Sequence, residues 1–160
     1  MIFKKISFSA LTLFIILSGC GFKPIKMENI SKISLAELKM IGNENVNFEI
    51  GSYLKQVLSY KKDKLIKIKV IINSKKEKTV KEKNNKNEIT KYNLTVISNV
   101  KVDILETNKN FAFTITKLNE YKVAERHSTT LQNEKKSINE ITNNLSQDIA
   151  DNILLGLNDN

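Results

Sequence analysis

The sequence predicts an α+β domain, a two-layer sandwich in which about four strands form a mixed, antiparallel-rich sheet and two helices cover one face. Apolar residues alternate with polar ones in the segments 64–73, 91–105 and 111–123, which is the period of a strand. In the segments 47–60 and 128–157 they recur every three or four residues, which is the period of a helix. With a first strand at 30–41, the predicted order is β-α-β-β-β-α.

The two helices are predicted from their apolar stripes. The first carries Ile50, Leu54, Val57 and Leu58, and the second carries Leu131, Ile138, Ile141, Leu145, Ile149 and Ile153. Asn47 can cap the first helix, since its side chain can accept a hydrogen bond from a free backbone N–H. Ser137 and Glu140 have the spacing of a capping box, which predicts that the regular second helix begins near Ser137 and ends at Gly156.

The strands assign side chains to the two faces of the sheet, because successive residues of a strand point to opposite sides. The residues predicted to face the helices are Ile66, Ile68, Val70, Tyr92, Leu94 and Val96. The residues predicted on the other face, which nothing else in the chain can cover, include Lys67, Lys69, Lys91 and Lys101. An asparagine-rich turn at 106–110 makes a hairpin of the last two strands. Residues 74–90 are almost without apolar content, which predicts a long, mobile hairpin loop.

The N-terminus has the three parts of an export signal. A basic start at Lys4 and Lys5 precedes an apolar run from Ile6 to Leu17 and then small residues. This run is shorter than the roughly 20 apolar residues that span a membrane, so we expect residues 1–19 to be removed. Residues 20–29 would then form a lipidated N-terminus and tether, and residues 30–160 one domain.

Cys20 is the only cysteine, so it cannot form an internal disulfide. The run Leu17-Ser18-Gly19-Cys20 resembles a bacterial lipobox, the site at which a lipoprotein signal peptidase cuts. This resemblance implies a diacylglycerol on the Cys20 sulfur and an acylated amine. Two or three acyl chains hold a protein on a membrane, whereas one does so only marginally. The alternative is that Cys20 is an ordinary apolar residue at the end of a signal or membrane segment.

The formal net charge is +9, or about +7 without Lys4 and Lys5, and all but one of the 26 basic residues are lysine. Two interpretations stay open. Abundant lysine, asparagine and isoleucine are typical of an AT-rich genome, in which codon bias alone gives such a charge. The charge could instead attract an anionic partner, which for an exported protein means a phosphorylated glycolipid or a membrane surface. Nucleic acid is not expected, because the sequence holds no nucleic-acid-binding module.

We expect no enzyme activity from this sequence. Its single histidine, His127, lies near Glu125 and Ser128, but nothing gives these residues the geometry of a Ser-His-Asp triad. No set of His, Cys, Asp and Glu has the spacing of a metal site, and the five glycines are isolated rather than grouped in a phosphate-binding loop. No metal or cofactor is therefore expected, apart from the covalent lipid on Cys20.

The lipobox is followed directly by "GFKPI", and here the chain resembles the LptE family of lipopolysaccharide-assembly lipoproteins. "CGFKPI" is similar to the CGF-x-P-hydrophobic start of that family, and "KYNLTVISNVKV" is similar to its long polar-alternating strand with Tyr92 at the start. The long C-terminal helix is similar to the one that closes the family's domain.

The resemblance implies a lipid-anchored outer-membrane protein that faces the periplasm within a barrel lumen. It would plug an LptD-like β-barrel, assist the assembly of that barrel and contact lipopolysaccharide. The candidate lipopolysaccharide-binding residues are Lys67, Lys69, Lys91 and Lys101, and the basic segment 75–91 fits the same role. A second function stays open, in which a free periplasm-facing lipoprotein of the same architecture binds an acidic ligand or a cell-wall polymer.

Overall fold

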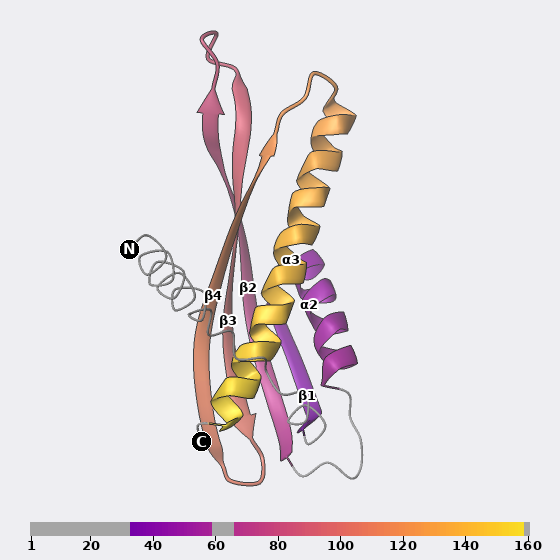
Figure 1. Cartoon of the computed structure of the whole chain (residues 1–160), viewed down its shortest axis with the longest axis vertical. Helices are drawn as coiled ribbons and strands as arrows, with labels where there is room; N and C mark the ends of the chain where they lie inside the picture. Colours follow the sequence, from indigo (N-terminus) through magenta and orange to yellow (C-terminus); the bar gives the residue numbers. More distant parts are fainter. Residues whose placement is uncertain (1–32, 59–65, 159–160) are drawn as a thin grey trace, which may run out of the picture.

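The computed structural model describes residues 33–58 and 66–158, and it confirms the predicted fold class and element order (Figure 1). The elements are β1 (Ile33–Gly42), α2 (Glu44–Val57), β2 (Ile66–Lys83), β3 (Ile89–Ile104), β4 (Lys109–Lys122) and α3 (His127–Asn158). The strands form one sheet in the order β1-β2-β3-β4, with β1 parallel to β2 and the other two pairs antiparallel. Both helices pack on one face of it. The predicted signal segment 1–19, Cys20 and the tether 20–29 lie outside the described residues.

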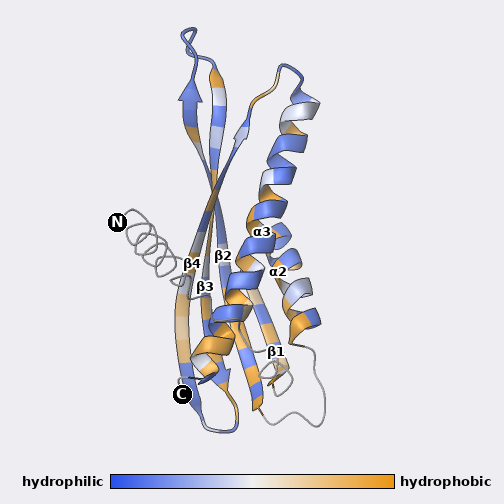
Figure 2. Cartoon of the chain, in the orientation of Figure 1, coloured by the Kyte–Doolittle hydropathy of each residue, from blue (hydrophilic) through white to orange (hydrophobic). Residues whose placement is uncertain are grey.

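The strands β2, β3 and β4 are long, and β1 lies beside only one end of this sheet. The core lies between that end of the sheet and the two helices. It contains inward residues of every element except β4, all at most 2% exposed, including Val46, Ile50, Leu54, Ile68, Val70, Ile72, Val96, Val100, Leu145, Ile149 and Ile153. Figure 2 shows apolar residues gathered in this half of the molecule. The faces predicted for β2 and β3 are confirmed, because Ile68 and Val70 are buried on the same side as Leu94 and Val96.

A tight turn joins β1 to α2. Gly42 has a φ of +99°, and a Cβ there would lie 2.1 Å from the backbone oxygen of Ser74, so only glycine fits. Asn43 caps α2, because its side-chain oxygen accepts a hydrogen bond from the Val46 N–H at 3.2 Å. The prediction that Asn47 caps this helix was wrong, since Asn47 is a buried residue of its first turns.

Residues 74–90 are not the loop that their composition predicted. β2 continues to Lys83 and pairs with β3 as far as Ile89, so that only residues 84–88 form the turn. Every residue from Lys78 to Lys83 is exposed, so the ladder of backbone hydrogen bonds, rather than burial, keeps this part of β2 extended. We call residues 75–95 the arm. In Figure 1 the arm projects beyond α2, while the start of α3 lies alongside it.

The helix α3 is longer than predicted at both ends. It begins at His127, about three turns before the predicted start at Ser137, and it ends at Asn158. Ser137 lies within the helix, where its hydroxyl is buried and has no hydrogen-bond partner in the described chain. Gly156 does not end the helix. It lets α3 pack closely against the Phe111 ring, since a Cβ at this position would lie 2.4 Å from that ring. Neither described helix combines the length and the apolar content that a membrane span requires.

Candidate functional site

The face of the sheet that points away from the helices is the candidate functional surface, and we call it the open face. No described element covers it. Alternation along the strands places all four predicted lysines there: Lys67, Lys69, Lys91 and Lys101. Their neighbours on this face are Glu37, Ile41, Ile71, Asn73, Ile97, Asn99, Thr114, Thr116 and Leu118. The open face is therefore a mixture of ion pairs, hydroxyl and amide groups, and a few exposed aliphatic side chains.

Three of the four lysines have carboxylate partners that the sequence did not indicate. Lys69 lies 2.8 Å from the Glu37 carboxylate, Lys101 lies 3.1 Å from Asp103, and Lys91 lies 2.5 Å from Glu82. The hydrogen bond from Lys91 holds the pKa of the Glu82 carboxyl below its ordinary value. Exposed pairs of this kind cost little to separate, so the lysines can still exchange their partner for an incoming anion.

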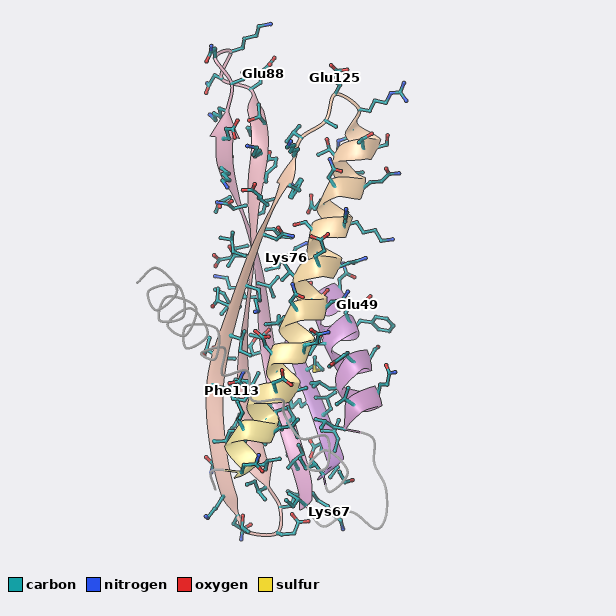
Figure 3. All side chains as sticks on the ribbon, viewed as in Figure 1. Glu49, Lys67, Lys76, Glu88, Phe113 and Glu125 are labelled. Carbon is teal, nitrogen blue, oxygen red and sulfur yellow. The ribbon has the colours of Figure 1, made fainter. Side chains whose placement is uncertain are left out.

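Lys67 differs from the other three because its side chain makes no ion pair with any described residue. Its backbone N–H instead donates to the carboxylate of Glu106, at 2.9 Å to each oxygen. Figure 3 shows Lys67 at the end of the sheet opposite to Glu88, which lies at the tip of the arm. The four lysines are thus spread along the open face and do not form one compact basic site.

A hollow of about 500 Å³ lies in the middle of the open face. Its lining is mostly uncharged and includes Ile41, Ile71, Asn73, Asn99, Ala112 and Thr114, with Lys101 as its charged member. The Thr114 hydroxyl donates to the Asn99 side-chain oxygen at 2.7 Å across β3 and β4. This hollow therefore offers hydrogen-bonding groups and aliphatic surface together, but little net charge.

On the opposite face, a polar cluster fastens the arm to the start of α3. Glu134 of α3 accepts hydrogen bonds from the Lys78 ammonium at 3.0 Å and from the Tyr121 hydroxyl at 2.8 Å. The Lys78 ammonium also lies 4.3 Å from the centre of the Tyr92 ring, and this ring stacks on that of Tyr121 at 5.5 Å. Lys78 falls in the segment predicted as a loop, so no strand period was available to place it beside Tyr92.

The cluster stabilises its own charges. Burial favours the neutral form of Glu134, but the hydrogen bonds from Lys78 and Tyr121 outweigh it and hold the pKa of this carboxyl below its ordinary value. Burial also favours neutral Lys78, but its hydrogen bonds to Tyr121 and Glu134 raise its pKa above 10.5. The pair is therefore charged from mildly acidic to strongly basic pH.

The arm carries the strongest concentration of positive charge. Residues 75–91 contain seven lysines and three glutamates. Most of these lysines are engaged, because Lys75 pairs with Glu77 and Lys81 pairs with Glu120. At the tip, Lys83 donates to the Asn87 side chain, and neither Lys83 nor Lys86 has an acidic partner among the described residues. An anion that binds Lys83 or Lys86 at the arm tip would therefore displace no acidic side chain of the described residues.

The residues considered for catalysis are exposed. His127 is the first residue of α3, and Glu125 and Ser128 beside it are exposed as well. Within residues 33–58 and 66–158, no group of three His, Cys, Asp or Glu side chains could hold a metal ion.

Comparison with known proteins places the fold. No family model matches the sequence, and no curated protein matches it. Among solved structures, rare lipoprotein B from Shewanella oneidensis has a TM-score of 0.59 and 10% identity, over 77% of this chain and 97% of that one. The uncharacterized lipoprotein B from Nitrosomonas europaea has a TM-score of 0.53 and 11% identity, over 81% of this chain and 87% of that one. The fold is one that bacterial lipoproteins have. The predicted fold of the domain is thereby confirmed at the level of architecture.

Proposed function

We propose that this chain is an outer-membrane lipoprotein, anchored through acylated Cys20 and facing the periplasm. It plugs an LptD-like β-barrel, assists the assembly of that barrel and contacts lipopolysaccharide during its export. The observation that carries this proposal is the open face, a polar sheet surface that no described element covers, on a domain with the fold of bacterial lipoproteins. The resemblance of "CGFKPI" to the start of LptE proteins agrees with it.

The open face suits the inside of a barrel because of what it leaves exposed. The lumen of a large outer-membrane barrel is polar, so a plug has to present polar groups whose charges are already balanced. On the open face Lys69, Lys91 and Lys101 are each paired with a carboxylate of the same chain. Most apolar residues of the strands are on the other side, beneath α2 and α3, and only a few aliphatic side chains lie on the open face.

The lysines provide the contact with lipopolysaccharide in this proposal. Phosphate groups of the glycolipid would exchange with the exposed carboxylates that now pair with Lys69, Lys91 and Lys101, and they would meet Lys67 directly. Lys83 and Lys86 at the arm tip offer further charge without a competing carboxylate. Each such contact is weak and screened by salt, so binding would depend on several lysines together. We propose no catalytic step and no cofactor other than the lipid.

Co-purification tests the barrel. The tagged full-length lipoprotein is extracted from its own bacterium in mild detergent, and the proteins that remain bound after washing are identified and quantified. We expect one large β-barrel protein at equal stoichiometry. Recovery of the lipoprotein without a stable barrel partner would overturn the proposal and favour a free lipoprotein that binds an acidic ligand or a cell-wall polymer.

The Cys20→Ala variant tests the anchor. It removes the acylated sulfur, while the described core lies wholly within residues 33–158, so the domain should stay folded but leave the membrane fraction. Fractionation with a salt wash, in cells that lack the barrel partner, measures this. An alanine variant that stays with the membranes as firmly as the parent would show that acylation is not the anchor.

A further inference from the structure

Along most of the outer edge of β4, the backbone groups have no partner among the described residues. The Val123 N–H donates to the Thr90 carbonyl at 2.9 Å, so in this antiparallel ladder the odd-numbered residues of β4 point their backbone groups at β3 and the even-numbered ones point away. The outward N–H of Glu120 donates to the Asn119 side-chain oxygen, and the outward carbonyl of Lys122 accepts a hydrogen bond from the Asn133 side chain. In the described chain, no such partner meets the outward groups of Asn110, Ala112, Thr114, Thr116 and Leu118.

This edge has few of the features that usually protect an edge strand, since Lys117 is the one inward charge between Asn110 and Leu118. Edge strands avoid pairing through prolines, bulges or inward charges, and the other edge of this sheet, β1, has a bulge between Leu35 and Glu37. The β3–β4 register runs without a shift from Lys109 to Lys122, and neither strand contains proline. The stretch 111–116, "FAFTIT", is uncharged and made of aromatic, β-branched and alanine residues, a composition that favours strand pairing.

We propose that this edge pairs antiparallel with the same edge of a second copy of the chain, about a two-fold axis at Thr114. Only the register centred on Thr114 uses the outward groups of all the unpartnered residues from Asn110 to Leu118. Thr114 then lies opposite its own copy, Ala112 opposite Thr116, and Asn110 opposite Leu118. Such a contact is closed and symmetric, so it ends at a dimer.

The side chains on both faces suit this register. On the helix-covered face Phe113 lies opposite Ile115, a pairing of aromatic and β-branched residues that stabilises antiparallel strands. Phe111 lies opposite Lys117, whose charge is already paired with Asp148 of its own chain. No two like charges face each other between Asn110 and Leu118. The dimer concerns the chain alone and does not rest on the proposed function.

Cysteine cross-linking tests the register. The full-length Cys20→Ser chain, purified in mild detergent, has no thiol, and Thr114→Cys introduces one. In a hydrogen-bonded pair the two Cα atoms lie about 5.5 Å apart, within the range of a disulfide, whereas two copies of residue 112 would lie roughly 14 Å apart. We therefore expect mild oxidation to link Thr114→Cys at least ~10-fold faster than Ala112→Cys. The double variant with Ala112→Cys and Thr116→Cys should link as well. Equal rates for the two single variants would overturn the proposal.

A proline at the same position tests the edge itself. Thr114→Pro removes an outward N–H and the hydroxyl that donates to Asn99, but no backbone hydrogen bond between β3 and β4, so it should leave that ladder intact and convert the dimer to a monomer in sedimentation experiments. Thr114→Ala is the matched control, because it also loses the hydrogen bond to Asn99 but keeps the N–H, and it should remain a dimer. A parent chain that is monomeric at high concentration would overturn the proposal, as would a folded proline variant that stays dimeric.

Discussion

The two halves of the sheet are built from the same strands but are stabilised differently. In the half with the core, the inward residues of β2 are Ile68, Val70 and Ile72, each fully buried beneath the helices. In the arm the corresponding positions are Lys76 and Lys78, and α3 contacts Lys78 through the carboxylate of Glu134. One continuous strand can thus be held by apolar burial over one half and by backbone pairing and a charge cluster over the other.

The change from one half to the other occurs at a single pair of serines. Ser74 and Ser98 face each other on β2 and β3, both are at most 1% exposed, and their hydroxyl oxygens lie 2.9 Å apart. Because each hydroxyl satisfies the other, the pair can be buried at little cost. Beyond it, β3 still buries Leu94 and Val96, while β2 presents lysines. The contacts of the arm should therefore cost less free energy to break than those of the core.

The largest effect is expected from the core end of α3. Leu145 is fully buried, so Leu145→Ala should lower the free energy of unfolding by about 2–5 kcal/mol. Leu131→Ala is the matched control on the arm end of the same helix, where the side chain is 53% exposed, and it should cost less than about 0.5 kcal/mol. Urea titrations measure both. Similar losses for the two variants would show that the halves are equally buried.

Glycine substitutions test how tightly the helices are packed on the core half. Gly156→Ala places a Cβ 2.4 Å from the Phe111 ring and should destabilise the protein by about 1–3 kcal/mol. Gly51→Ala in α2 meets the Leu38 side chain at an ordinary 3.7 Å and should instead stabilise it, by up to about 1 kcal/mol. Thermal unfolding measures both. Adding Phe111→Leu to Gly156→Ala should recover part of the loss, and no recovery would show that the ring is not the obstacle.

A smaller, pH-dependent effect is expected in the arm. Glu134→Gln removes the charge that Lys78 and Tyr121 bind and should cost about 0.5–1.5 kcal/mol near neutral pH. The pKa of Glu134 is lowered by folding, so its contribution is present above its ordinary value of 4.5 and is lost as the pH falls through the lower folded value. Unfolding titrations from neutral pH to about pH 3 should therefore converge for parent and variant. Glu77→Gln, on the exposed side of the arm, is the control, and parallel curves for parent and Glu134→Gln would contradict the role of the cluster.

The smallest effect on stability is expected from the open face. Replacing Lys67, Lys69, Lys91 and Lys101 together with Gln should change the free energy of unfolding by no more than about 1 kcal/mol, since their ion pairs are exposed. The same variant should bind lipopolysaccharide more weakly, most visibly at low salt, because salt screens these contacts in the parent. Unchanged affinity at low ionic strength would place the binding surface elsewhere, and a variant with Lys83→Gln and Lys86→Gln would then test the arm tip.

The lysines of the candidate site could be predicted from the sequence, but the carboxylates that pair with them could not. The period of two was enough to place Lys67, Lys69 and Lys101 on the open face, because alternation needs no knowledge of which strands are neighbours. The carboxylates of Glu37 and Glu82 could not be assigned to Lys69 and Lys91, since these pairs depend on the register of β1 with β2 and of β2 with β3. The cluster around Glu134 was missed because Lys78 was predicted to lie in a loop and because its contacts depend on how α3 packs on β2 and β4.

The sequence by itself determined the order of the elements, the inward faces of the strands and the amphipathic stripe of α3, because each is a local period of apolar residues that only one kind of element can bury. The tertiary structure decided the length of the arm and the true start of α3. Neither has an apolar pattern of its own, and both exist because a neighbour continues beside them: β3 supplies backbone partners for residues 75–83, and Tyr121 and Lys78 give Glu134 its contacts. Such pairings lie between segments that are distant in the chain, where composition and periodicity carry no signal.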